Sequence, residues 1–180
     1  SRAILEMPQT QKKLLDAIQK TGKPIVMVLF TGRPLALQSE EKQVNAILNV
    51  WFGGTEAGAA IADVLTGKVS PTGKLTMSFP RVTGQCPIYY NHKMTGRPMS
   101  PDAWYTRYVS NYIDVLNEPL YPFGYGLSYT TYTYGDVSLN TNSIDANGKI
   151  QASVIVTNTG AQDGEEIVQL YLRDIVRSIT

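Results

Sequence analysis

The stretch from Trp51 to Pro80 constrains the fold of this chain more than any other segment. Two aromatic residues end an apolar run, and a glycine-rich turn follows. A helix of small residues then leads through a Ser-Pro-Thr-Gly corner into another apolar run that stops at a proline. Short apolar runs bounded by turn residues are typical of buried strands, and helical connections between such strands favour parallel pairing. The segment therefore predicts a β-α-β unit.

The residues upstream of this stretch extend the same pattern. Pro8 suits the first turn of a helix, where its missing N–H costs little, and Gly22 can end that helix in a left-handed conformation. The apolar run after Pro24 and the run from Val44 to Phe52 are each bounded by turn residues. Each run therefore predicts a buried strand.

Two further elements complete the predicted α/β region. A helix is expected from about Glu56 to Thr66, and a third strand is expected from Lys74 to Ser78. Because helical crossovers join the strands, the fold class predicted for residues 1–80 is α/β, with a mainly parallel sheet flanked by helices.

The pattern changes twice after Pro80. Residues 81–127 are rich in proline, glycine and tyrosine and have no sustained periodicity, which is typical of a long interdomain loop region. From 128 to 180, apolar and polar residues alternate around turn signals such as Asn147-Gly148. This alternation predicts the start of an antiparallel all-β sandwich, and it is partial because an immunoglobulin-like sandwich needs about seven strands.

Composition excludes several classes of protein. Apolar residues make up 43% of the chain, charged residues 17%, and the net charge is +1 without a basic stripe, so no nucleic-acid partner is expected. No apolar run approaches the roughly 18 residues of a membrane span. The single cysteine, Cys86, excludes an internal disulfide framework.

The long loop region carries the candidate binding residues. His92 is the only histidine, and because no Cys or Asp cluster surrounds it, neither a metal site nor another cofactor is expected. Imidazole and guanidinium donors among aromatic side chains are typical of carbohydrate sites. His92 and Arg97 are therefore the candidate substrate-binding residues, and a polar surface histidine is the alternative.

The glycine-rich turn at residues 53–58 has two interpretations. It precedes a helix and could bind an anion at the helix N-terminus, as a nucleotide-binding domain would. It lacks the Gly-Lys-Ser/Thr ending of a phosphate-binding loop, and its spacing differs from GxGxxG. Tight strand-to-helix packing is the favoured interpretation, with Glu56 stabilising the helix dipole.

No catalytic residue is assigned from the chain itself. Glycosidase chemistry needs two carboxylates about 5 to 9 Å apart. The loop acids Asp102, Asp114 and Glu118 are not paired by any pattern in the sequence. Solvated surface acids are the expected outcome for them.

Taken together, the motifs resemble the C-terminal part of periplasmic-type β-glucosidases of glycoside hydrolase family 3. The matching pieces are KPIVMVLFTGRPLAL, the run from Trp51 to Pro80, PIYYNHKMTGRP, YPFGYGLSYTTYTY, and VIVTNTG with GEEIVQLYLRD. The order of so many motifs is specific, and together they extend over essentially the whole chain.

The resemblance implies a retaining exo-glycosidase with a barrel domain, an α/β sandwich and a fibronectin type III-like domain. This chain would hold an incomplete α/β sandwich and a partial fibronectin type III/immunoglobulin-like sandwich. An Asp on the barrel is the family's nucleophile, and a Glu just ahead of the position of Ser1-Arg2 is its acid/base. Glu6 does not match that position. We therefore expect the chain, which lacks an initiator methionine, to come from a longer protein and to be inactive alone.

The resemblance also implies partners and a location. The substrate of the intact enzyme would be a β-glucoside or oligosaccharide, and the N-terminal barrel of the same chain would be a packing partner. The parent protein would be periplasmic or extracellular, although no signal peptide is present. The unfinished sandwich also predicts self-association, and a non-catalytic carbohydrate-binding or structural module is the alternative function.

Overall fold

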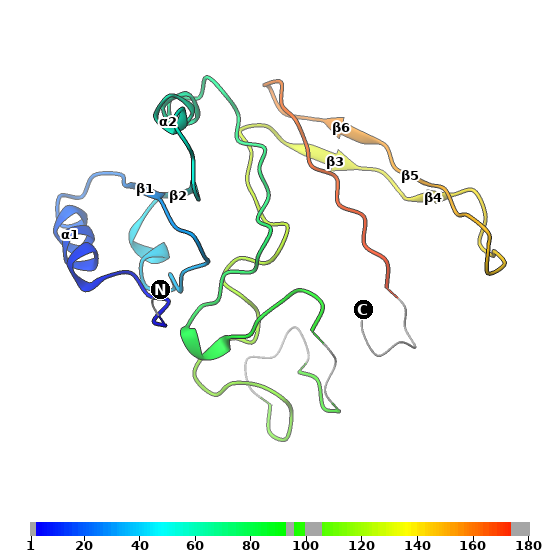
Figure 1. Ribbon diagram of the computed structural model, residues 1–180, viewed down its shortest axis with the longest axis horizontal. Helices are drawn as coiled ribbons and strands as arrows, with labels where there is room; N and C mark the ends of the chain where they lie inside the picture. The colour runs from blue at the N-terminus through cyan, green and yellow to red at the C-terminus, as the bar shows by residue number, and fades with distance from the viewer. Residues whose placement is uncertain (1–2, 93–95, 100–105, 174–180) are drawn as a thin grey trace. The chain divides into compact units, whose positions relative to one another are not determined.

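The computed structural model describes residues 3–92, 96–99 and 106–173 (Figure 1). The chain divides into two compact units. The first contains the segments Ser1–Ile61, Lys74–Tyr125 and Gln169–Thr180, and the second contains Ala62–Gly73 and Gly126–Val168.

The first unit begins with helix α1, Gln9–Gln19. Pro8 precedes the helix, and its carbonyl accepts hydrogen bonds from the backbone N–H groups of Gln11 and Lys12 at 2.9 and 3.1 Å. Gly22 has a φ of +68°, a left-handed conformation that glycine adopts without strain. The sequence prediction of a helix between this proline and this glycine is confirmed.

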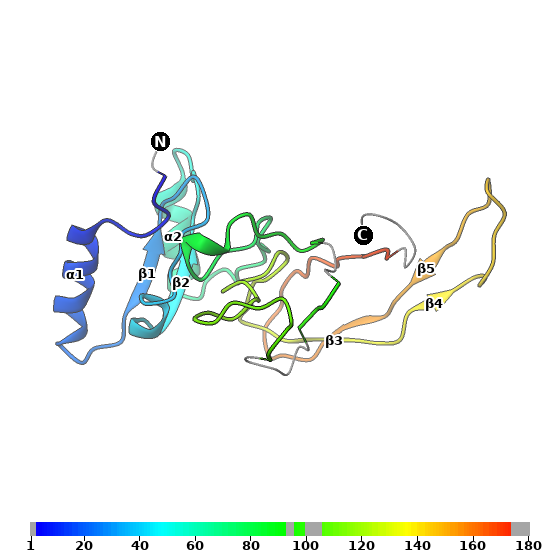
Figure 2. The same ribbon diagram turned by 90° about the horizontal axis from the view of Figure 1, so that it is seen from below.

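Strands β1 (Val26–Leu29) and β2 (Ala46–Asn49) form a parallel pair. Val26 lies opposite Ala46, and the register continues to Leu29 opposite Asn49. The connection between the strands contains the short 3-10 helix η1, Glu41–Gln43. Both strands were predicted from apolar runs, and their parallel pairing confirms that part of the expected sheet (Figure 2).

The expected third strand at Lys74–Ser78 is wrong. Among the described residues, this segment joins neither β1 nor β2. Its backbone pairs instead in the antiparallel sense with residues 120–125: Leu75 N–H donates to the Tyr125 carbonyl, and Phe79 N–H donates to the Tyr121 carbonyl, both at 2.8 Å. The apolar pattern located a buried segment correctly, but it contains no information about a partner more than 40 residues away in the chain.

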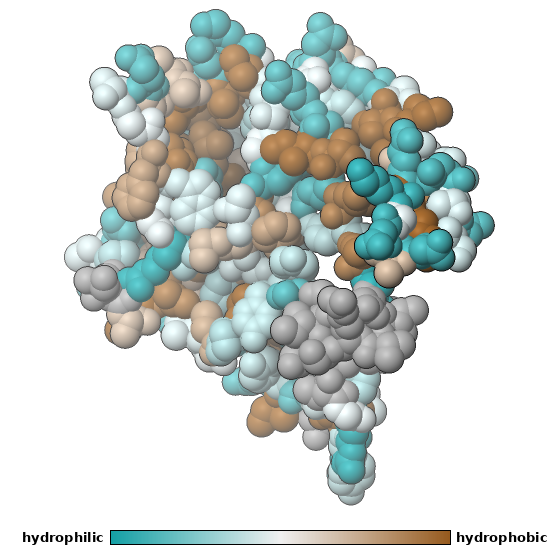
Figure 3. Space-filling model, turned by 45° about the vertical axis from the view of Figure 1, so that its right-hand side comes forward, coloured by the Kyte–Doolittle hydropathy of each residue, from teal (hydrophilic) through white to brown (hydrophobic). Residues whose placement is uncertain are grey.

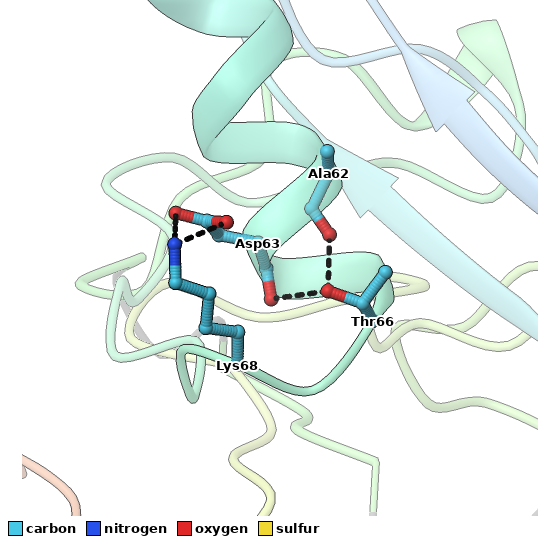
Figure 4. A network of polar contacts seen from close by, with 4 residues as sticks. All are labelled: Ala62, Asp63, Thr66 and Lys68. Carbon is cyan, nitrogen blue, oxygen red and sulfur yellow. Dashed lines mark hydrogen bonds and ion pairs between the residues drawn. The ribbon is translucent and has the colours of Figure 1, made fainter.

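Helix α2, Ala57–Leu65, follows the glycine-rich turn as predicted. At its C-terminal end the Thr66 hydroxyl donates to the Ala62 carbonyl at 2.7 Å, and Lys68 lies 3.0 Å from the Asp63 carboxylate (Figure 4). Gly67, with a φ of +76°, then turns the chain away from the helix axis.

The core of the first unit lies around Leu29, Leu37 and Phe79, which are 7%, 0% and 2% exposed. The ring of Phe79 contacts two other aromatic rings edge-on, those of Trp51 and Tyr121, at centroid distances of 5.9 and 6.1 Å. β1 and the segment around Phe79 therefore meet in one small apolar cluster.

The second unit is built from short antiparallel pairs. β3 (Tyr132–Tyr134) pairs with β6 (Val156–Asn158), and β4 (Ser138–Leu139) pairs with β5 (Ala152–Ser153). The predicted change to an antiparallel all-β region is confirmed at this coarse level. Apolar and polar residues also alternate at 168–172, where the same reasoning predicts a strand, but these residues form none.

Several large apolar side chains remain at the surface (Figure 3). Leu14 of α1 is 61% exposed and Ile155 of the second unit is 77% exposed. Among the described residues, no helix is both long and apolar enough to span a membrane.

Candidate functional site

One buried amide, that of Gln85, links the two arms of the long loop between residues 79 and 121 near its base. Gln85 is 3% exposed and ends the short 3-10 helix η2, Thr83–Gln85. Its Oε1 accepts a hydrogen bond from Arg81 N–H at 2.6 Å, and its Nε2 donates to the Leu116 carbonyl at 2.7 Å. The amide thus links the outgoing and returning arms of the loop.

A second amide, that of Asn117, organises the returning arm. Its Nδ2 donates to the Ser110 carbonyl at 2.8 Å, and its Oδ1 accepts from Tyr112 N–H at 3.1 Å. Ser110 N–H in turn donates to the Arg97 carbonyl at 2.8 Å. The backbone of one candidate binding residue, Arg97, is therefore tied to the arm that Asn117 organises.

Both predicted binding residues, His92 and Arg97, are exposed. The chain before His92 is anchored, because the ring of Tyr90 stacks on Phe123 at a centroid distance of 4.7 Å and contacts Tyr171 edge-on at 5.8 Å. The structure gives no contact between the His92 and Arg97 side chains, so their convergence on one ligand stays a prediction.

Other loop residues singled out from the sequence divide between described and undescribed parts. Asp102 lies outside the described residues. Asp114 and Glu118 are exposed, as expected for solvated acids. Tyr108 is 75% exposed and has a φ of +68°, a left-handed conformation that a residue with a Cβ adopts only at some cost. Such outliers gather at binding sites, and this one lies two residues before Ser110.

Two carboxylates, those of Glu6 and Glu40, surround one ammonium group at the edge of the first unit. Lys12 Nζ lies 3.0 Å from Glu40 Oε1 and 3.9 Å from Glu6 Oε2. Glu40 is 1% exposed, and its other oxygen accepts a hydrogen bond from the Ser39 hydroxyl at 2.8 Å. Because both Glu40 oxygens are engaged and buried, this pair is a structural ion pair and not the pair of carboxylates that glycoside hydrolysis needs.

A shallow hollow of about 500 Å³ lies at the carboxyl end of β1, where α/β sheets commonly bind ligands. Phe30, Thr31 and Arg33 contribute to its lining. The sequence identified this segment only as a loop after a strand. Phe52 is 86% exposed nearby, and a Cβ added to Gly32 would lie 2.7 Å from Cζ of its ring. The absence of a side chain at Gly32 therefore leaves room for the Phe52 ring.

The glycine-rich turn packs tightly, as its favoured interpretation predicted. A Cβ added to Gly53 would lie 2.5 Å from Cβ of Ala57, the first residue of α2, and Gly54 has a φ of +67°. Both glycines are therefore explained by backbone approach and conformation.

Burial raises the pKa of Tyr121 to about 12, with further contributions from the nearby Glu41 carboxylate and Tyr125 phenol. The Tyr121 hydroxyl therefore stays un-ionised to a higher pH than an ordinary tyrosine hydroxyl does. Among the described residues, no group of His, Cys, Asp and Glu side chains is arranged to hold a metal ion.

The family model for the glycosyl hydrolase family 3 C-terminal domain matches residues 1–129. The chain belongs to glycosyl hydrolase family 3. The resemblance identified from the ordered motifs is therefore confirmed, and the match covers all of the first unit up to Tyr125.

Relatives within the family are similar along nearly the whole chain. A periplasmic beta-glucosidase of Salmonella typhimurium is 53% identical over 180 residues, which are 100% of this chain and 23% of that protein. A beta-xylosidase of Formosa agariphila is 47% identical over 178 residues, covering 99% of this chain and 24% of that protein. The chain thus spans about a quarter of the length of these relatives.

Solved structures of beta-glucosidases match the fold. A crystal structure of a beta-glucosidase from Listeria innocua in complex with glucose has a TM-score of 0.92 and 44% sequence identity, covering 100% of this chain and 25% of that one. A structure of a second beta-glucosidase, from Erythrobacter marinus, has a TM-score of 0.78 and 39% identity.

Sequence reasoning missed the residues that shape the loop. Gln85 and Asn117 stand outside any periodic pattern, and the groups they bind are 4 to 33 and 5 to 7 residues away, respectively. Amides in a loop are ordinarily solvated, so no local signal distinguishes these two. Only the fold shows that they are the hydrogen-bonded links of this family 3 domain.

Proposed function

We propose that the whole protein is a retaining, exo-acting β-glucosidase that removes terminal β-D-glucosyl residues, and that this chain is its C-terminal part. The observation that carries the proposal is the 53% identity to a periplasmic beta-glucosidase along the entire chain. A relative with that name also supports a periplasmic or extracellular location for the parent protein.

The two catalytic carboxylates of the family are proposed to lie outside these residues. In family 3 an Asp of the barrel domain attacks the sugar, and a Glu of the α/β domain serves as acid and base. Retention follows from the covalent glycosyl-enzyme intermediate that the nucleophile forms. The contribution of this chain is then to wall the pocket around the sugar and to bind its hydroxyl groups.

The finer organisation is also a proposal. We assign residues 1–80 to the α/β sandwich, 81–127 to an interdomain loop region, and 128–180 to a fibronectin type III-like domain. The parallel β1–β2 pair supports the first assignment, and the antiparallel β3–β6 and β4–β5 pairs support the last. The exposed apolar side chains of both units suit packing against the barrel of the same protein, or self-association of this chain when that barrel is absent.

The sugar has a second candidate, because a beta-xylosidase is 47% identical along 99% of the chain. The two substrates differ by the hydroxymethyl group that xylose lacks. Initial rates of the whole enzyme on aryl β-glucoside and aryl β-xyloside distinguish the candidates, and we expect the higher kcat/KM on the glucoside. A protein that hydrolyses neither, yet binds oligosaccharides, would instead be the non-catalytic module.

The loop is proposed to contact the sugar through His92 and Arg97. Both side chains are exposed donors on a loop anchored by stacking of Tyr90 and by the Gln85 amide. In the whole enzyme, His92→Ala or Arg97→Ala should lower kcat/KM roughly tenfold or more, which is the loss of about one hydrogen bond to a charged or desolvated group.

The control for these variants is Lys149→Ala, which removes an exposed charge from the second unit. Lys149→Ala should keep wild-type kinetics. If His92→Ala and Arg97→Ala also keep wild-type kinetics but melt at lower temperature, the loop only packs domains together, and its assignment to the sugar pocket fails.

A further inference from the structure

We propose that Asn117, held in turn by Gln85, is a positioning residue that sets where Arg97 meets the substrate. The inference rests on the proposed sugar contact of Arg97. It concerns a different property, namely how hydrogen bonds within the loop hold that residue in one place.

The first step is the base of the loop. Gln85 is 3% exposed, so a missing hydrogen-bond partner would leave a buried polar atom unsatisfied. Its Nε2 donates to the Leu116 carbonyl at 2.7 Å and lies 3.3 Å from the Glu118 carbonyl, while Arg81 Nε donates to the same Glu118 oxygen at 3.1 Å. These bonds fix the backbone on both sides of Asn117.

The second step runs from Asn117 to Arg97. One amide satisfies a carbonyl and an N–H of the facing segment, those of Ser110 and Tyr112, at 2.8 and 3.1 Å. Ser110 lies beside Pro98 in a parallel bridge, and its N–H donates to the Arg97 carbonyl at 2.8 Å. The path from Gln85 to the Arg97 backbone is therefore continuous, and every link is a direct hydrogen bond or an adjacent residue.

The third step is that the Asn117 amide donates one of these hydrogen bonds and accepts the other. An amide side chain is donor and acceptor at once, whereas an ionised carboxylate only accepts. Asn117→Asp keeps the shape but places a negative oxygen against the Ser110 carbonyl. A positional error of about 1 Å in a binding group can lower a rate by about 100-fold. Loss of the Asn117 hydrogen bonds should therefore displace Arg97 and lower the rate of the reaction.

The test is a double-mutant cycle in the whole enzyme. Asn117→Ala and Asn117→Asp should each lower kcat/KM on an aryl β-glucoside by roughly fivefold or more. In an Arg97→Ala background, Asn117→Ala should cause little further loss, because the group it positions is gone. Equal losses in both backgrounds, or no loss in either, would overturn the proposal.

The matched control is Asn158→Ala. Asn158 also bridges two groups with one amide, since its Oδ1 accepts from the Thr130 hydroxyl at 2.7 Å and its Nδ2 donates to the Gln162 carbonyl at 2.9 Å, but it lies in the second unit. Asn158→Ala should lower the melting temperature and leave kcat/KM unchanged. A purely structural role for Asn117 would make the two variants behave alike.

A second measurement separates this inference from the proposed function. Hydrogen exchange at the Ser110 amide, which donates to Arg97, should accelerate in Asn117→Ala whatever the kinetics show. Suppose that Arg97→Ala retains wild-type kcat/KM while exchange at the Ser110 amide accelerates in Asn117→Ala. The proposed sugar contact of Arg97 is then refuted, and the hydrogen-bonded link from Asn117 to the Arg97 backbone is supported. Unchanged exchange in Asn117→Ala would refute the positioning role itself.

Discussion

The ion pair of Lys12 and Glu40 shows how strongly one residue can depend on another. The side chain of Glu40 is 2% exposed and that of Lys12 is 24% exposed. A buried charge without its partner is strongly destabilising, because desolvation is no longer compensated. The exposed pair of Lys68 and Asp63, with side chains 71% and 36% exposed, has the same 3.0 Å separation and offers a direct comparison.

Lys12→Met should therefore lower the free energy of unfolding by about 3 kcal/mol or more, whereas Lys68→Met should change it by about 0–1 kcal/mol. Urea denaturation of the two variants measures both values. Adding Glu40→Gln to Lys12→Met should recover part of the loss, since no buried charge remains. Equal effects at the buried and the exposed lysine would refute the interpretation.

Tyr121 provides a prediction that depends on pH. Its phenol has a pKa of about 12 in the folded protein against 10.0 in the unfolded chain, chiefly because burial disfavours the phenolate. The stability that the neutral phenol contributes is therefore complete below about pH 10 and is lost as the pH rises through about 12. Ultraviolet titration of wild type minus Tyr121→Phe should give a phenolate curve centred near 12. A curve centred near 10 would mean that the ring is solvated.

Substitution by alanine should change stability in opposite directions at two glycines, one inside α2 and one just after it. Gly67 has a φ of +76°, so Gly67→Ala should destabilise the protein by about 1 kcal/mol. Gly58 lies inside α2, and a Cβ there meets nothing within 4 Å, so Gly58→Ala should stabilise by about 0.5–1 kcal/mol. Thermal melts of both variants check the opposite signs, and a loss at Gly58 would show that another surface packs there.

Helices and strands with local signals were predictable from sequence, and those defined by distant partners were not. Gly22 and Gly67 follow the ends of α1 and α2, where a left-handed conformation favours glycine. The two apolar runs predicted the positions of β1 and β2. Lys74–Ser78 was assigned to the parallel sheet because it followed a helix. Its partner, residues 120–125, lies beyond a long segment with no periodicity, where no pattern indicates pairing.

The candidate site divides in the same way. Residue type and loop context were sufficient to select His92 and Arg97, and the structure shows both exposed. The amides of Gln85 and Asn117 link backbone segments of the loop. They were missed because neither composition nor periodicity indicates a hydrogen bond from a side chain to a backbone group. Whether the two selected side chains bind sugar stays a prediction.

For the molecule as a whole, the family assignment predicts that this chain alone hydrolyses no aryl β-glucoside. Binding without an acid/base and a nucleophile leaves little rate enhancement, and both groups are proposed to lie outside these residues. Highly purified chain should release no aryl alcohol above the rate in buffer, while the whole enzyme does. Turnover that Glu6→Gln abolishes would place a catalytic acid within this chain after all.

The antiparallel pairing of Leu75–Phe79 with residues 120–125 joins the two ends of the long loop, and this affects how freely the loop can vary. The ends of the intervening excursion are fixed to each other, so its interior can change in length without pulling on the core. Closing a flexible loop twice as long costs only about 0.6 kcal/mol more. Replacing the residues between these two paired segments is thus a graft with fixed attachment points, which changes the loop and leaves the core of the first unit as it is.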